Sequence, residues 1–303
     1  MDRLISEILT CGAPVVVGLD PTLGMIPERI KKENLEKYGV SLKAAAGMLL
    51  DFNKEIIDAI YDIVPAVKPQ IAMYEQFGPE GVAVYAATTT YAREKGMVVI
   101  GDVKRGDIAS TAEAYAAHIK GVCFEDVDFE PWCEDAVTLN PYLGIDGIEP
   151  FIRVCESRNK GIFVLVKTSN PSSSQLQDLL LKDKEITVFE HIADLVSEWG
   201  RSTIGSLGYS SVGAVVGATF AEQGAALRKR MPHTFFLVPG YGAQGATGRD
   251  LRGFFDRDGK GCIVNSSRGI IAAWQKNQRF GENDIGEAAR QAAMDMIQDL
   301  SCL

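Results

Sequence analysis

The strongest constraint on the fold is a regular alternation of short apolar runs with amphipathic helical segments. Eight runs are rich in β-branched or other apolar residues, and most are followed by a helical pattern. The runs span residues 15–20, 64–70, 98–104, 136–140, 161–168, 212–218, 234–239 and 261–265. Strands that alternate with helices predict a parallel sheet covered by helices, and eight such units favour closure into a barrel. An open, doubly wound sheet is the alternative architecture.

Helical patterns fill the segments between these runs. They occupy residues 42–61, 81–95, 109–121, 147–159, 186–200, 221–231 and 284–300, with a short turn at 249–255. An extra helix is expected at 27–38, after the first strand, and a long loop at 170–185 follows the fifth. Long loops at the carboxyl ends of barrel strands form lids and binding surfaces. We therefore expect an α/β protein in which residues 1–303 form a single (β/α)8 TIM-barrel domain with an extra helix inserted after strand 1.

Composition places the chain among ordinary globular proteins. The net charge of -9 argues against nucleic acid or an anionic membrane as a partner, although a small anionic ligand stays open. The six cysteines include no Cys-x-x-Cys pair, and with only three histidines they give no zinc pattern. Residues 1–10 predict a short amphipathic helix, and no apolar run approaches membrane-spanning length. We expect a cytoplasmic protein with reduced thiols and no bound metal.

The third apolar run, followed through to residue 107, ends in charge. In an extended strand Asp102 and Lys104 share one face, and Asp107 follows three residues later. Burying such charges costs desolvation free energy unless they neutralise one another or take part in chemistry. One alternative is a structural ion pair, with Asp107 capping the next helix. The sequence Ser110-Thr111-Ala112-Glu113 offers that helix a capping box of its own, which favours a functional site.

Polar residues end nearly every predicted strand. Active sites of (β/α)8 barrels lie at the carboxyl ends of the strands, so these residues are expected to meet at one mouth. They are Asp20, Lys68, Asp102, Lys104, Asn140, Thr168, Ser169, Thr219 and the segment 265–268. Structural alternatives exist: Asp20 and Asn140 both precede proline and suit turns. Lys68 could instead extend toward solvent, and Arg268 could be an ordinary surface residue.

The segment Gly240–Gly245 matches the pattern Gly-x-Gly-x-x-Gly of dinucleotide-binding proteins. It follows the seventh strand rather than the first strand of a βαβ unit, and no clear ribose-binding acid closes a following strand. Open backbone N–H groups suit a phosphate, and the loops after strands seven and eight are the usual phosphate site of a barrel. We interpret the segment as a phosphate cradle, with Arg268 as its counter-charge.

Taken together, these motifs resemble the orotidine 5'-phosphate decarboxylase family, in particular its longer bacterial (type 2) branch. The similarity covers nearly the whole barrel. It runs through residues 18–21, 67–69, 102–108, 166–171, 239–245 and 265–269. The pattern Asp-x-Lys-x-x-Asp alone also occurs in related sugar-phosphate barrels. The specificity of the resemblance therefore comes from its combination with Lys68 and with the motifs after strands seven and eight.

The resemblance implies a role for each strand-end residue. Lys104 would donate a proton to C6 of the pyrimidine, with Asp102 beside the substrate carboxylate and Asp107 reaching in from the partner subunit of a homodimer. Lys68 and Asp107 would complete an alternating charge network. The remaining substrate contacts would be Asp20 and Lys68 to the ribose, Ile108 and Thr111 across the dimer, Thr168 or Ser169 to the pyrimidine, Gln244 and Arg268 to the phosphate, and Pro239 lining the pocket.

The implied reaction converts orotidine 5'-monophosphate to UMP and CO2 in pyrimidine synthesis. Loss of CO2 from C6 leaves a carbanion without an adjacent π acceptor, and no cofactor motif is evident. Stabilisation would then fall to the ammonium of Lys104, whose charged form the flanking Asp102 and Asp107 favour. Three alternatives stay open: a metal-dependent sugar-phosphate decarboxylase or synthase of the same barrel group, a Schiff-base aldolase, and a non-catalytic nucleotide-binding barrel.

Overall fold

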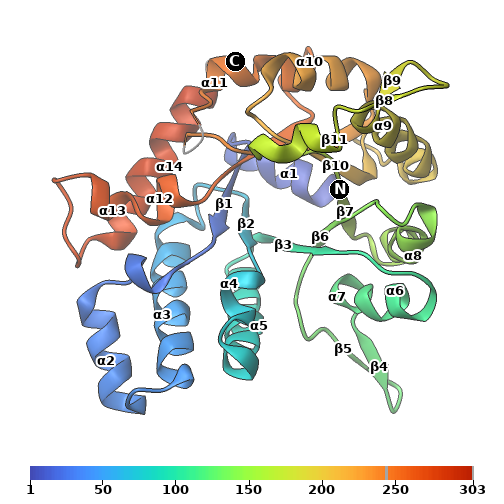
Figure 1. Ribbon diagram of the computed structural model, residues 1–303. Coiled ribbons are helices and arrows are strands. Elements are labelled where there is room, and N and C mark those ends of the chain that lie inside the picture. Colours follow the sequence, from blue (N-terminus) through green and yellow to red (C-terminus); the bar gives the residue numbers. More distant parts are fainter. Residues whose placement is uncertain (243–244, 302–303) are drawn as a thin grey trace.

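A closed, eight-stranded parallel barrel forms the centre of the molecule (Figure 1). The computed structural model describes residues 1–242 and 245–301. Neighbouring strands of the barrel follow one another in sequence, and the last pairs with the first to close it. The strands are β1 Val15–Leu19, β2 Ala66–Pro69, β3 Val98–Arg105, β6 Ala136–Leu139, β7 Gly161–Lys167, β10 Ser210–Val216, β11 Thr234–Pro239 and β12 Cys262–Ser266. The predicted (β/α)8 barrel is confirmed, with strands close to their expected bounds.

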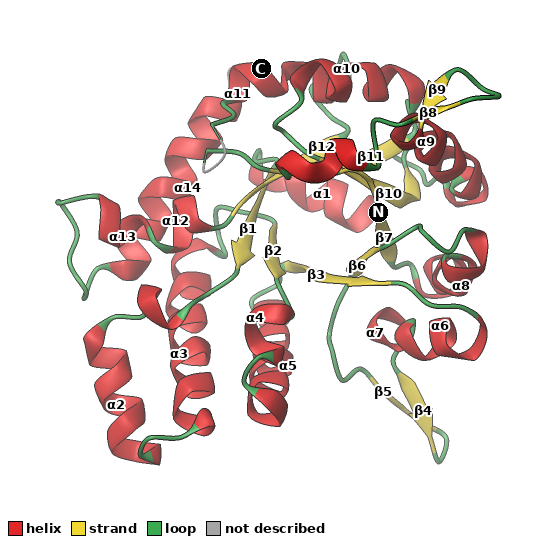
Figure 2. Cartoon of the chain, viewed as in Figure 1, coloured by secondary structure: helices red, strands yellow, loops and turns green. Residues whose placement is uncertain are grey.

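Helices surround the barrel on its outer face (Figure 2). Their apolar sides pack on outward-facing strand residues such as Val99 and Val103, in one continuous core. The helices that follow the strands are α3 Leu42–Ile60, α4 Ala72–Glu75, α5 Gly78–Glu94, α6 Ala109–Tyr115, α7 Ala117–Lys120, α8 Glu149–Arg158, α9 Val188–Trp199, α10 Ala221–Arg230, α11 Gly248–Leu251, α12 Arg268–Ile271, α13 Ala273–Lys276 and α14 Ile285–Ser301. Among the helices described, none is long and apolar enough to cross a membrane.

Side chains inside the barrel change from apolar to polar along its axis. Ile100 and Ile263 belong to an apolar cluster that fills the interior. Because side chains of a strand alternate between faces, the residues two positions farther along point the same way. Those residues are Asp102 on β3 and Asn265 on β12, both buried. The apolar filling therefore stops one layer short of the strand carboxyl ends, where the polar residues begin.

The predicted extra helix is present after the first strand. A short 3-10 turn at Leu23–Met25 leads into α2, Glu28–Tyr38, which packs against α3. The predicted amino-terminal helix is also present, as α1, Asp2–Cys11. Its residues Leu4 and Ile5 join the apolar cluster inside the barrel, so α1 covers the amino end of the strands.

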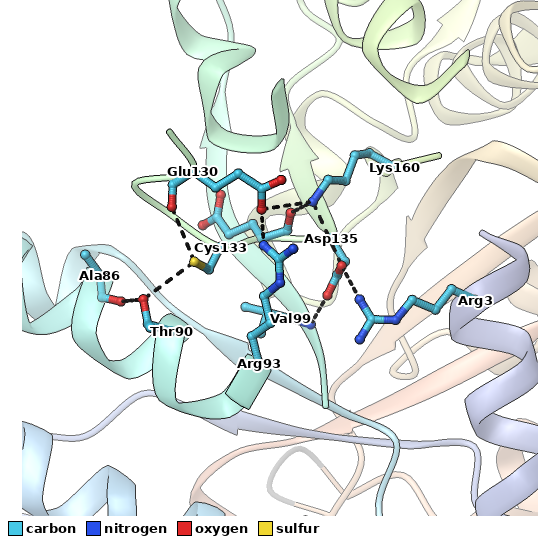
Figure 3. A network of polar contacts seen from close by, with 10 residues as sticks. Arg3, Ala86, Thr90, Arg93, Val99, Glu130, Cys133, Asp135 and Lys160 are labelled. Atoms are coloured by element: carbon cyan, nitrogen blue, oxygen red, sulfur yellow. Dashed lines mark hydrogen bonds and ion pairs between the residues drawn. The ribbon is translucent and has the colours of Figure 1, made fainter. Parts of the chain in front are cut away.

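Polar contacts at this amino end join α1 to the strands (Figure 3). The carboxylate of Asp135, just before β6, accepts hydrogen bonds from the Arg3 guanidinium at 2.5 Å and from the Val99 amide at 3.0 Å. The Lys160 ammonium, just before β7, lies 4.0 Å from Asp135 Oδ1 and donates to the Glu134 carbonyl at 2.7 Å. The first turn of α1 is thus tied to β3, β6 and β7 at the end of the barrel remote from the polar layer.

Two small hairpins lie outside the predicted pattern. β4, Val122–Phe124, and β5, Val127–Phe129, form an antiparallel pair that projects from the barrel below α6 and α7 in Figure 1. A second pair, β8 at Leu180–Leu181 and β9 at Ile186–Thr187, folds the long loop after β7. The helix expected from residue 186 begins at Val188 instead, where Thr187 and Glu190 form a capping box.

The helix after β3 begins differently from the prediction. The capping box expected from Ser110 and Glu113 is wrong, because α6 starts at Ala109 with Ile108 as its N-cap residue and has no side-chain cap. Ala109 has a left-handed backbone, with φ of 49°, and Ser110 already lies within the first turn. Asp107 does not cap the helix either, since its Oδ1 accepts a hydrogen bond from the adjacent Ile108 amide at 2.8 Å.

Candidate active site

The carboxyl ends of the strands surround a cavity of about 490 Å³. Five predicted site residues line it: Asp20, Lys68, Asp102, Pro239 and Arg268. They come from the ends of β1, β2, β3 and β11 and from the segment after β12, so the barrel closure alone brings them together. A cavity at this end of the strands is the usual place for ligand binding in a (β/α)8 barrel.

Three charged side chains at the mouth form a continuous chain of ion pairs. Asp102 Oδ2 accepts a hydrogen bond from Lys68 Nζ at 2.7 Å, and Asp102 Oδ1 accepts one from Lys104 Nζ at 2.5 Å. The side chains of Lys68 and Asp102 are 5% and 10% exposed, whereas that of Lys104 is 45% exposed. Lys68 therefore points into the barrel rather than to solvent. The ammonium of Lys104, at one end of this series of ion pairs, is the charged group that a ligand can reach.

In the buried pair of Lys68 and Asp102, each charge stabilises the ionised form of the other. Burial alone would raise the pKa of Asp102, but the ammonium groups of Lys68 and Lys104 hold it well below its ordinary value. Burial alone would lower the pKa of Lys68, but the carboxylates of Asp102 and Asp20 outweigh that effect and raise it. Both groups are consequently ionised at neutral pH, and the cavity wall carries fixed charges of opposite sign.

An irregular backbone presents Lys104 at the mouth. Lys104 has a φ of 45°, in the left-handed region that side chains seldom adopt, and the register between β3 and β6 shifts between Gly101 and Arg105. Such shifts re-aim side chains at the ends of strands. Thr138 on β6 holds both Lys104 and Asp102 in place. Its Oγ1 accepts a hydrogen bond from the Lys104 amide at 3.0 Å and donates one to Asp102 Oδ1 at 2.9 Å.

Asp107, Ile108 and Thr111 lie apart from the ion-pair chain. They occupy the loop after β3 and the first turn of α6, where the Ile108 side chain is 49% exposed and Thr111 is also exposed. The ion pairs found within the described residues do not include one between Asp107 and Lys104. Within the described part of a single chain, the second aspartate of the Asp-x-Lys-x-x-Asp pattern therefore forms no ion pair with the lysine.

The residues predicted to bind the phosphate follow the carboxyl ends of β11 and β12. Arg268 is exposed beside the cavity, at the start of α12. Gly240 and Gly242 have φ values of 109° and 69°, so the loop after β11 uses backbone conformations that favour glycine. Gln244, the other expected phosphate ligand, lies outside the described residues. Tyr241 lines the cavity between the two glycines.

Two oxygen atoms of the cavity residues are buried without a hydrogen-bond partner in the described part of the chain: Asp20 Oδ1 and Asn265 Oδ1. Asn140, by contrast, is occupied locally, because its Oδ1 accepts from the Tyr142 amide at 3.0 Å. That contact makes Asn140 a turn residue, in agreement with the alternative offered by its position before proline. Asp20 and Asn265 have acceptor capacity left for a ligand.

The long loop after β7 is folded against the strand end. The Gln177 side chain accepts from the Thr168 amide at 3.0 Å and donates to Thr168 Oγ1 at 2.7 Å. The neighbouring Asp178 carboxylate pairs with the fully buried Lys167 ammonium at 2.7 Å. Gln177 and Asp178 thus hold the last residue of β7 and the residue after it, which fixes the position of Thr168 and of the adjacent Ser169.

Several cavity residues were not singled out by the sequence pattern. They are Thr22, Met25 and Met73 in the cavity lining, and Thr138, which lies behind the lining and holds the ion-pair chain. Gly240, Tyr241, Asn265 and Ser267 also line the cavity, and they belong to the predicted segments 240–245 and 265–268. Strand alternation in the run 136–140 could have placed Thr138 inside the barrel, next to Asp102 on the neighbouring strand. The methionines carry no comparable signal, since apolar residues after a strand are common in cores.

Comparison with known proteins identifies the family. A sequence profile described as the orotidine 5'-phosphate decarboxylase / HUMPS family matches residues 14–280. The chain belongs to this family. It is 45% identical over 302 residues to the orotidine 5'-phosphate decarboxylase of Rhodopirellula baltica, with 98% of this chain and 97% of the relative covered. It is 44% identical over 301 residues to that of Petrotoga mobilis, with coverage of 99% and 97%.

The fold agrees with a solved member of the same family. The structure of Leishmania donovani OMP decarboxylase is similar to this chain with a TM-score of 0.74 and 29% sequence identity. The match covers 99% of this chain and 97% of that protein. The family resemblance derived from the strand-end motifs is therefore confirmed over the full barrel, and the chain is a carboxy-lyase of the decarboxylase family.

Proposed function

We propose that the mouth cavity binds orotidine 5'-monophosphate and that Lys104 delivers the proton to C6 of its pyrimidine ring. The activity, decarboxylation to UMP and CO2 in pyrimidine synthesis, follows from the family. The observation that carries the assignment of roles is the chain Lys68–Asp102–Lys104, with two buried members and one exposed ammonium. We further propose that the reaction takes place in the cytoplasm and uses no cofactor.

The chemistry follows from where negative charge develops. When the C6 carboxylate leaves as CO2, its bonding electron pair stays on C6, and Lys104 stabilises that carbanion before transferring a proton to it. A unit charge pair at about 4 Å is worth about 4 kcal/mol at an effective dielectric near 20. Large enzymatic rate enhancements correspond to roughly 20 kcal/mol. Binding of the phosphate and ribose must therefore supply the remaining stabilisation by fixing the reacting ring against the ammonium.

The other cavity residues divide along the length of the nucleotide. Arg268 and the loop after β11, with Gln244, hold the phosphate, while Asp20 and Lys68 hold the ribose and Pro239 lines the pocket. Thr168 or Ser169 contacts the pyrimidine edge, at the strand end that Gln177 keeps in place. Asp102 lies beside the substrate carboxylate, where its ionised state, held by Lys68, opposes that second negative charge.

We also propose that the enzyme is a homodimer whose sites are shared. Asp107 would enter the partner's site together with Ile108 and Thr111. Two features of the single chain support this proposal: these residues lie on an accessible loop, with Ile108 exposed, and Asp107 is held by its own neighbour's amide rather than by Lys104. A second copy would bring a further carboxylate to an ammonium that is open on one side.

The activity is tested by following the absorbance of the orotate ring with purified protein in excess EDTA. We expect turnover to persist in EDTA, and we expect Lys104→Ala to abolish turnover while UMP still binds by calorimetry. Turnover that depends on added divalent metal would favour the sugar-phosphate branch of the barrel group. A wild-type rate in Lys104→Ala would remove Lys104 from the mechanism.

Shared sites are tested by mixing two inactive variants. Lys104→Ala and Asp107→Ala each lack one group, so a hybrid dimer would contain one site with both groups intact. We expect activity to reappear on mixing, up to about a quarter of the wild-type rate per subunit when exchange is complete, since half of the dimers are hybrids with one good site each. Verified subunit exchange without recovery would show that each site is built from one chain.

A further inference from the structure

We propose that Asn265 is a further substrate-binding residue, whose side-chain amide accepts a hydrogen bond from a ribose hydroxyl of the nucleotide. The inference rests on the proposed function, since it requires a nucleotide in the cavity. Asn265 lies on the inward face of β12, lines the cavity and is only 7% exposed. No strand-end motif assigned it a role of its own.

Only the NH2 group of the Asn265 side-chain amide has a hydrogen-bond partner among the described residues. Its Nδ2 donates to Ser267 Oγ at 3.3 Å, whereas its Oδ1 is buried and has no partner in the part of the chain that is described. A buried acceptor without a partner loses its hydration with nothing in return. Asp20 Oδ1, in the wall of the same cavity, is in the same condition. The strands β1 and β12 are hydrogen-bonded neighbours, so the two residues with unsatisfied acceptors belong to adjacent parts of the cavity wall.

The position of β12 in the barrel decides which part of the nucleotide supplies the donor. Lys104, assigned to the pyrimidine, lies on β3, and Arg268, assigned to the phosphate, follows β12. The strands between these two groups are β1 and β2, which carry Asp20 and Lys68, and β12 adjoins them. A phosphate at neutral pH offers acceptors rather than donors. The ribose hydroxyls are the donors of a nucleotide that fall between its phosphate and its base.

The wall around Asn265 is closely packed, which fixes the amide in place. Gly18 of β1 lies against it: a Cβ atom at this position would fall 3.2 Å from Asn265 Oδ1 and 1.8 Å from Ser267 Oγ. The Ser267 and Asn265 side chains thus take up the space that a side chain at Gly18 would need. An acceptor that is already held before the ligand arrives loses little entropy on binding.

The test is a binding cycle between residue and ligand. UMP, 2'-deoxy-UMP and 3'-deoxy-UMP are titrated by calorimetry into the wild type and into Asn265→Ala. We expect Asn265→Ala to bind UMP about tenfold more weakly, the scale of one buried hydrogen bond left unmade. One deoxy analogue is expected to lose a similar factor in the wild type and little further in the variant. Asn34→Ala, which removes a buried amide that does not line the cavity, is the control, with the hydroxyl effect expected to stay as in the wild type.

A second variant separates binding from folding. Asn265→Leu removes the unpaired acceptor at similar volume, so its unfolding midpoint without ligand is expected to equal or exceed that of the wild type, while UMP raises the midpoint by less. A midpoint several degrees lower would make Asn265 a structural residue and overturn the proposal. The proposal is also overturned if removing either ribose hydroxyl weakens binding by the same factor in the wild type and in Asn265→Ala, provided that the wild type decarboxylates orotidine 5'-monophosphate. A wild type that neither binds UMP nor turns over would instead overturn the proposed function.

Discussion

The two lysines paired with Asp102 are expected to differ sharply in what they contribute to folding. Lys68 is 5% exposed and Asp102 10% exposed, so replacing Lys68 by methionine deprives a buried carboxylate of its buried partner. Breaking such a pair costs about 3–5 kcal/mol. Lys104 is 45% exposed, and its pair with Asp102 is screened by water. The change Lys104→Met is therefore expected to cost about 1 kcal/mol or less.

Unfolding experiments convert these energies into a measurable contrast. With about 2.1 cal/mol/K of unfolding entropy per residue, a chain of 303 residues changes its stability by roughly 0.6 kcal/mol per degree near the midpoint. Thermal unfolding followed by circular dichroism should then place Lys68→Met about 5–8 °C below the wild type and Lys104→Met within about 2 °C of it. Both variants are expected to lose most of their turnover, so activity alone cannot distinguish them. Equal shifts of the two midpoints would refute the reasoning from burial.

Three further predictions follow from the same geometry. Because the folded pKa of Asp102 is depressed, its contribution to stability is present above pH ~4 and lost as the pH falls, so urea unfolding between pH 2 and 5 should show a shallower acid decline for Asp102→Asn. Gly18→Ala places a Cβ 1.8 Å from Ser267 Oγ and 2.8 Å from its Cβ, so UMP affinity measured by calorimetry should fall by about tenfold or more; unchanged affinity would contradict the close packing. Lys167→Met leaves Asp178 without its ammonium, so limited proteolysis within residues 170–185 should be faster, whereas Lys167→Arg should stay near wild type.

The barrel could be predicted because its signals are local and repeated. Each strand is a short apolar run, and each helix is an amphipathic pattern of ordinary length. The β4–β5 hairpin was not predicted because its turn lacks the usual sequence signal. The turn residues Glu125 and Asp126 both have positive φ, and neither is glycine or asparagine. The prediction of a capping box at Ser110 failed because the helix begins two residues earlier, at a left-handed Ala109 with Ile108 as its N-cap residue, and helix propensities do not predict that conformation.

The sequence predicted which residues belong to the candidate site better than it predicted the contacts between them. The strand-end rule brought Asp20, Lys68, Asp102 and Arg268 to one mouth without knowledge of their contacts. It could not show that Thr138 holds Asp102, since that contact depends on the register shift between β3 and β6. Contacts made across two chains, such as those proposed for Asp107, leave no trace in the local pattern of one chain.

The left-handed backbone at Lys104 has a consequence for screens that select barrels by yield or solubility. Such a conformation costs a side-chain-bearing residue about 1–2 kcal/mol, and glycine escapes that cost. A substitution to glycine at this position would therefore erase the ammonium while leaving a product about as robust as its parent. Inactive clones carrying it would pass any filter based on expression or heat resistance, so only a direct readout of turnover would expose them.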